Sequence, residues 1–206
     1  MKLRLTSLLL GGLAVSVASL VAQEAQPLAA PAIKAAPLAA PAVNPLISRI
    51  ALGSCMKQDR PMPVLRTVRE FQPELFVWLG DNIYGDTNDM DVLAAKYARL
   101  GRQPDFSTLR AEVPMVATWD DHDYGVNDGG REYSKKEASK EVFLRFWGEP
   151  AETARRQRPG IYTSYRFTDP KSKRTLQLIV LDTRTFRSPL VKHTVLSYKN
   201  DYRPDA

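Results

Sequence analysis

The sequence LFVWLGDNIY, residues 75–84, joins an uninterrupted apolar run to a polar turn that carries carboxylate and phenol groups. Two other segments share this layout: IALGSC at residues 50–55 and PMVATWDDHD at residues 114–123. Short apolar runs bounded by Gly, Pro and Asp are typical of strands buried on both faces of a parallel sheet. In an open α/β sheet, the loops that leave the carboxyl ends of the strands gather along one edge, where ligands bind. We therefore expect the polar residues after the three runs to meet in space.

The rest of the sequence predicts helices and a hairpin around this sheet. Apolar residues recur at helical spacing over residues 63–71 and 91–100, and SKKE at residues 134–137 is typical of a capping box that begins a further helix. Residues 162–167 and 175–181, joined by an Asp-Pro-Lys-Ser turn, predict an antiparallel hairpin added to the same sheet. Together these elements predict an α/β fold.

The first 46 residues differ in composition from those that follow. Residues 1–22 combine a basic start, an apolar stretch and small residues, which is the layout of a secretory signal peptide. They are too short to favour a permanent membrane span, so none is expected after signal cleavage. Residues 23–46, rich in Ala and Pro, predict an extended linker. Residues 47–206 are enough for one hydrophobic core. The signal-peptide layout predicts a secreted or periplasmic protein.

The charge of the chain does not indicate a nucleic-acid partner. The sequence has 29 Lys and Arg against 23 Asp and Glu, a formal net charge of +6. Much of the basic charge lies in residues 135–140 and 155–158, which is typical of a solvated surface. A balance of this size is compatible with an anionic substrate but specifies no nucleic acid.

The polar segments after the first two runs offer ligands for metal ions. Cys55 is the only cysteine, and it is either a small buried hydrophobe at a strand end or a metal-binding thiolate. Asp81 can bridge two cations through its two carboxylate oxygens. Tyr84 can supply a phenolate if the turn between the two residues brings its side chain to the same side as Asp81. Thiolate and phenolate favour trivalent iron, whereas carboxylates favour calcium, magnesium or manganese. An ordinary Asp-Asn turn is the alternative explanation for Asp81 and Asn82.

Residues 120–123, Asp-Asp-His-Asp, place three carboxylates and an imidazole at a strand end. Such a cluster is electrostatically costly unless cations neutralise it. A solvated turn would also explain the cluster, but the apolar run before it favours a metal site.

Four motifs together resemble the alkaline phosphatase D, or PhoD-like, branch of the metallophosphoesterases: GSC at 53–55, LGDNIYGD at 79–86, TWDDHDYGVND at 118–128 and LDTRTFR at 181–187. They occur in the family's order. The resemblance implies an αββα sandwich with a mixed, largely parallel sheet. It also implies a multinuclear metal centre that activates water to hydrolyse phosphomonoesters or phosphodiesters.

The resemblance implies a role for each candidate ligand. Cys55 and Tyr84 would bind Fe³⁺, and Asp81 would bridge the metals. Asp121 would bind the second metal, for which Ca²⁺ or another divalent ion is expected. Asp120 would be a further metal ligand or would support the residues that bind the metal.

The resemblance also implies residues that act on the substrate. His122 would contact the phosphate and assist departure of the leaving group. Arg184 and Arg187 are candidate phosphate contacts, with pairing of a strand-end arginine to Asp182 as the alternative. Asn82 would support the substrate site through its amide.

The sequence departs from the family in one respect. The family supplies further histidine and aspartate ligands well after the LDTR segment, whereas this sequence ends at Ala206. The other histidine, His193, matches no family motif and is typical of a surface residue. An incomplete, truncated sandwich with an exposed sheet face is therefore expected, with self-association as a consequence. The alternative function is a catalytically incompetent fragment with residual metal binding or an interaction role.

Overall fold

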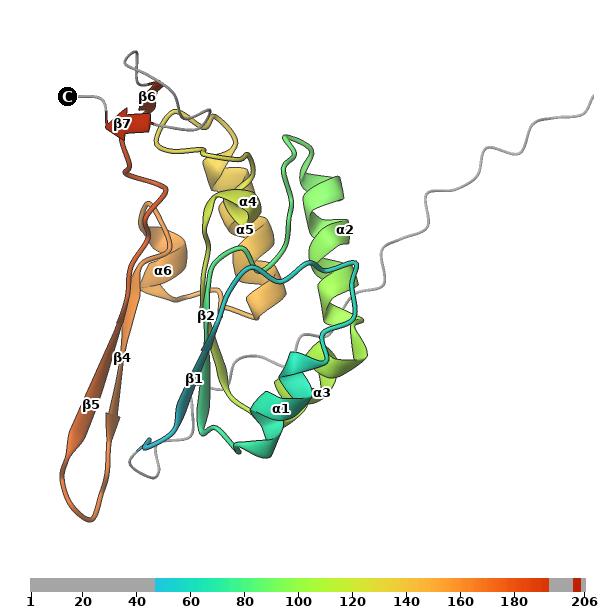
Figure 1. The fold of residues 1–206 in the computed structure, drawn as a ribbon. Coiled ribbons are helices and arrows are strands. Elements are labelled where there is room, and N and C mark those ends of the chain that lie inside the picture. Colours follow the sequence, from blue (N-terminus) through green and yellow to red (C-terminus); the bar gives the residue numbers. More distant parts are fainter. Residues whose placement is uncertain (1–46, 193–201, 205–206) are drawn as a thin grey trace, which may run out of the picture. The chain divides into compact units, whose positions relative to one another are not determined.

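The three apolar runs form a parallel sheet at the centre of the fold (Figure 1). The computed structural model describes residues 47–192 and 202–204, so the predicted signal peptide, the predicted linker and His193 lie outside it. The strands are β1 (Ile50–Gly53), β2 (Leu75–Leu79) and β3 (Met115–Thr118). They pair in the order β1-β2-β3, and both pairings are parallel, as predicted. β2 is buried along most of its length because it is the central strand.

Helices cover one face of this sheet (Figure 1). They are α1 (Val64–Glu70), α2 (Met90–Gly101), α3 (Pro104–Glu112) and α5 (Lys136–Trp147). The apolar spacing predicted α1, α2 and α5, whereas α3, which begins with a proline, was not predicted. The predicted capping box before α5 is wrong. Because that helix begins at Lys136, its N-cap is Lys135, which makes no side-chain cap hydrogen bond.

An aromatic core joins the helices to the sheet. Phe76 and Trp78, on one face of β2, pack against the helices. The Trp78 ring centroid lies 5.5 Å from that of Phe106 and 6.2 Å from that of Trp147, within the range of favourable aromatic pairs. Trp119, directly after β3, is buried in the same core. The core thus fixes the point at which the Asp-Asp-His-Asp segment begins.

A hairpin covers the other face of the sheet (Figure 1). Its strands, β4 (Thr163–Thr168) and β5 (Thr175–Val180), pair with each other in a separate two-stranded sheet. The prediction of the hairpin is confirmed, but the prediction that it joins the same sheet is wrong. Phe167 and Val180 instead pack against Val77 in a second core, because alternate side chains of β2 point to opposite faces.

The described residues therefore form an α/β fold in which a parallel sheet lies between helices and a hairpin. This confirms the predicted fold class as a partial sandwich. Among the strands that the structure describes, the antiparallel pairs are β4 with β5 and β6 (Leu190–Lys192) with β7 (Tyr202–Pro204). Two short helices, α4 (Asp121–Tyr124) and α6 (Ala154–Gln157), complete the described elements. None of the helices in this part of the chain has the length and apolarity needed to cross a membrane.

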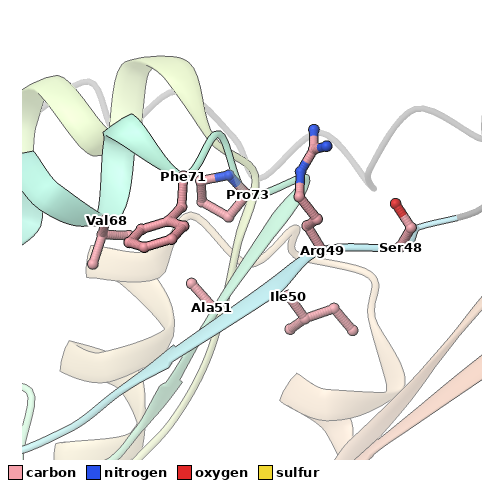
Figure 2. A pocket seen from close by; sticks show the side chains of 7 residues that line it. All are labelled: Ser48, Arg49, Ile50, Ala51, Val68, Phe71 and Pro73. Atoms are coloured by element: carbon pink, nitrogen blue, oxygen red, sulfur yellow. The ribbon is translucent and has the colours of Figure 1, made fainter.

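An open groove lies at the amino end of β1, with a volume of about 350 Å³ (Figure 2). Phe71, which is 73% exposed, and Val68 form one wall of it, and Ala51 lies at its base. Because the candidate ligands follow the carboxyl ends of the strands, the groove is separate from them. Ile50 and Leu52 of β1 are exposed and add apolar surface to this edge of the sheet.

Candidate metal centre

The loops after the three parallel strands lie side by side at the carboxyl edge of the sheet. The Cys55 amide donates a hydrogen bond to the Gly80 carbonyl at 3.3 Å, so the first loop contacts the second. The Gly85 amide donates to the His122 carbonyl at 2.9 Å, so the second loop contacts the third. The three motifs therefore gather at one edge, as the parallel arrangement predicts.

Gly80 allows the second and third loops to approach each other closely. Its φ is +108°, and a Cβ added there would lie 2.6 Å from the backbone nitrogen of Asp120. Both the backbone conformation and the close approach favour glycine. Asp81 has φ +50°, in the left-handed region that Asp adopts more readily than most residues. The Gly-Asp sequence thus permits the sharp turn that presents the Asp81 side chain.

Asp81, Asp121 and His122 form a tight group of ligand-bearing side chains. One ligand atom from each residue lies within 4.8 Å of the other two. Two more candidates lie beside this group: Cys55 Sγ is 3.6 Å from Asp81 Oδ2, and the ring centroids of Tyr84 and His122 are 4.2 Å apart. The structure therefore brings residues from all three loops to one place.

The Asp81 carboxyl group is suited to binding a cation. Its Oδ1 is buried and makes no hydrogen bond within the described part of the chain. Burial raises the pKa of Asp81; His122 lowers it, but Asp121 and Asp120 raise it further. Burial also raises the pKa of Tyr84, with Cys55 and Asp81 adding to the effect. A buried oxygen without a partner is costly, so these donors fit a metal ion that would supply the missing contact.

His122 is held by an acidic residue that the sequence analysis did not select. Nδ1 of His122 lies 2.7 Å from Oδ1 of Asp86. Burial lowers the pKa of His122, but the hydrogen bond and the charge of Asp86 outweigh it, so the pKa is raised. This contact orients the ring and favours its protonated form. The sequence did offer one sign of this contact: Asp86 is the last residue of the motif LGDNIYGD, which also contains Asp81.

Two further residues missed by the sequence analysis hold the backbone around Tyr84. The Tyr84 amide donates to Oε1 of Gln58 at 2.9 Å. Nζ of Lys96 donates to the carbonyls of Tyr84 at 3.0 Å and Gly85 at 2.6 Å. These contacts come from the first loop and from α2, and no local pattern in the sequence indicates them.

Arg184 lies against the acidic cluster. Its guanidinium pairs with Asp120 and, at 3.3 Å, with Asp121. Burial lowers the pKa of Arg184, but the two aspartates outweigh it and raise the pKa. The alternative prediction, a side-chain pair with Asp182, is wrong for Arg184: its contact with Asp182 is through its backbone amide, which donates to Oδ1 at 3.0 Å. The Arg184 side chain thus contacts two candidate ligands.

Asn82 and Arg187, both predicted to contact substrate, are engaged elsewhere. Asn82 is completely buried, and its Nδ2 donates to the Thr118 carbonyl at 2.8 Å. The Arg187 guanidinium donates to the carbonyl of Ser188 at 2.9 Å and to that of Asp128. These side chains bind backbone carbonyls, and their contact with substrate stays a prediction.

Fold and cluster together define a class: an α/β domain with a candidate metal site of carboxylate, imidazole, thiol and phenol groups at the carboxyl edge of a parallel sheet. No family model and no curated protein matches the chain.

A solved structure of PhoD has a similar fold, with a TM-score of 0.53 and 18% sequence identity. The similarity covers 72% of this chain and 34% of that chain, so this chain spans about a third of the length of its structural relative. The likeness confirms the predicted PhoD type of fold. At this level of identity it concerns the fold alone.

Proposed function

We propose that this chain carries the metal site of a phosphoric ester hydrolase. The observation that supports this most is the group formed by Asp81, Asp121 and His122, whose ligand atoms lie within 4.8 Å of one another. Carboxylate groups brought together from two loops at a sheet edge are suited to binding cations, and an imidazole beside them is suited to act on a bound ester. The fold resembles that of a structure named as PhoD.

The chemistry of the side chains suggests which metals the site binds. Cys55 and Tyr84, as thiolate and phenolate, favour Fe³⁺, and Asp81, whose Oδ2 lies 3.6 Å from Cys55 Sγ, would bind the same ion. Asp121 and Asp120 favour Ca²⁺ or another divalent ion. The metal ions would neutralise phosphoryl oxygens and activate water.

His122 and Arg184 are the residues that would act on the substrate. Because Asp86 occupies Nδ1 of His122, the second ring nitrogen is left to donate a proton or hydrogen bond to the departing ester oxygen. Arg184 carries the positive charge nearest to Asp120 and Asp121 and is suited to contact phosphoryl oxygens there. Phosphomonoesters and phosphodiesters both fit this arrangement.

The proposal includes export of the chain and its self-association. The amino-terminal sequence supports export to the periplasm or the medium. The exposed apolar side chains of Ile50 and Leu52 support self-association through the β1 edge.

A second candidate function is metal binding without ester hydrolysis. It is favoured by the pairing of Arg184 with Asp120 and Asp121, which occupies carboxylate oxygens that a second metal ion would need. Under this alternative the chain would bind one metal ion and turn over no ester.

Elemental analysis of the purified chain, combined with turnover of p-nitrophenyl phosphate and bis-p-nitrophenyl phosphate, tests the proposal. We expect bound metal and hydrolysis in the wild type and loss of both in Asp81→Asn. Asp59→Asn, which makes the same change at an exposed position, serves as the control. Bound metal without turnover would support the second candidate, and a chain that binds no added metal would refute both.

A further inference from the structure

Asp123 is a fully buried carboxylate at the junction of the second and third loops. Its Oδ1 accepts hydrogen bonds from the backbone amides of Asp120 at 2.7 Å and Asp81 at 3.3 Å. Its Oδ2 accepts from the backbone amide of Asn82 at 3.2 Å and from Asn82 Nδ2 at 2.5 Å. The Tyr97 hydroxyl, from α2, donates to the same Oδ2 at 3.3 Å.

These contacts act on the backbone of both ligand loops at once. The amides of Asp81 and Asn82 belong to the turn in which Asp81 has φ +50°. The amide of Asp120 belongs to the residue that precedes α4, so its hydrogen bond fixes where that short helix begins. Asp121 and His122 are the first two residues of α4. One carboxylate therefore sets the position of Asp81 relative to Asp121 and His122.

We propose that Asp123 is a positioning residue that sets the metal affinity of the site by tying the Asp81 turn to the start of α4. This inference rests on the proposed function, because it assumes that Asp81 and Asp121 hold a metal ion beside His122. Outer residues that fix ligand orientation commonly change metal affinity by about 10- to 100-fold when they are replaced.

The groups around Asp123 require a hydrogen-bond acceptor at both Oδ1 and Oδ2. All five neighbouring groups of Asp123 donate, and a carboxylate offers acceptor sites on each oxygen. An asparagine would turn an N–H₂ group toward donors on one side and leave them without partners. Asp123→Asn therefore leaves the donors at one oxygen without an acceptor and weakens the tie between the Asp81 turn and α4, while changing neither the size of the side chain nor the candidate ligands.

The experiment is a titration of the full chain with Mn²⁺ alone, with free Mn²⁺ followed by electron paramagnetic resonance. Mn²⁺ suits carboxylate ligands. We expect Asp123→Asn to bind Mn²⁺ about 10- to 100-fold more weakly than the wild type. Tyr97→Phe, which removes one of the five donors, is expected to bind about threefold more weakly, since the four hydrogen bonds to the two loops remain.

Leu75→Ala is the control for a general loss of stability. Leu75 is fully buried at the amino end of β2, whereas Asp81 follows the carboxyl end. We expect this variant to unfold at a lower urea concentration but to bind Mn²⁺ as the wild type does while folded. If Asp123→Asn does not fold, the comparison of Tyr97→Phe with Leu75→Ala decides the matter.

The outcomes separate this inference from the proposed function. Equal Mn²⁺ affinity in the wild type, Asp123→Asn and Tyr97→Phe would overturn the positioning role and leave the metal site standing. Equal weakening in Leu75→Ala would also overturn it, because the effect would then follow stability alone. A wild type that binds no Mn²⁺ would refute the metal site itself, and the inference with it.

Discussion

Replacement of Gly80 by alanine is expected to destabilise the fold and to separate the two ligand loops. Gly80 has φ +108°, a conformation that an L-residue with a Cβ adopts only with strain. The new Cβ would lie 2.5 Å from Asp120 Cβ and 2.6 Å from the Asp120 backbone nitrogen. Because backbone cannot move aside as a flexible side chain can, the two loops must part.

The magnitude has two contributions. Strained backbone at positive φ costs about 1–3 kcal/mol. Overpacking a closely packed contact costs about 1–3 kcal/mol more. We therefore expect Gly80→Ala to lower the free energy of unfolding by about 2–6 kcal/mol, a large part of the roughly 5–15 kcal/mol that stabilises a typical domain.

Urea unfolding followed by tryptophan fluorescence measures this change, and Gly148→Ala is the matched control. Gly148 follows α5 with φ +75°, so its replacement has the backbone cost at a helix end, away from the ligand loops. We expect Gly80→Ala to lose about 1–3 kcal/mol more than Gly148→Ala. Equal losses in the two variants would refute the close approach of the loops as the reason for glycine at this position.

Three other predictions concern the hairpin, Asp182 and His122. Phe167→Ala should cost about 3–5 kcal/mol in urea unfolding, because Phe167 fills the core between hairpin and sheet; a cost below about 1 kcal/mol would contradict that packing. Burial raises the pKa of Asp182, but hydrogen bonds from Trp119, Thr185 and Ile161 outweigh it and hold the pKa below its usual range, so its stabilisation is present above about pH 4 and is lost as the pH falls through the lowered value. Asp182→Asn should therefore cost about 2 kcal/mol at pH 7 and flatten the acid limb of stability against pH, whereas an unchanged acid limb would contradict this. His122→Ala should lower ester turnover about 10²- to 10⁴-fold without loss of stability, and turnover equal to the wild type would exclude His122 from the reaction.

The sequence was informative about the strands and about the kinds of groups that follow them. Continuous apolar runs are a local property, so the three strands, their parallel pairing and the edge at which their loops meet could be predicted from residues within each run. The helical spacing of α1, α2 and α5 was local in the same way. The residue types at the strand ends predicted that Asp81, Asp121 and His122 meet at one site, and they do lie together.

The partners of these groups were decided by tertiary structure. Asp86 and His122 are 36 positions apart, and Arg184 reaches Asp120 across 64 positions, so no local pattern could pair them. In the sequence nothing distinguishes Asp123 from Asp120 and Asp121. In the structure it is fully buried and accepts hydrogen bonds from the backbone of two loops. The sequence by itself determined which strands form and which chemical groups they present. Burial and partnership depend on which distant segments pack together, so only the tertiary structure separated candidate ligands from the residues that hold them.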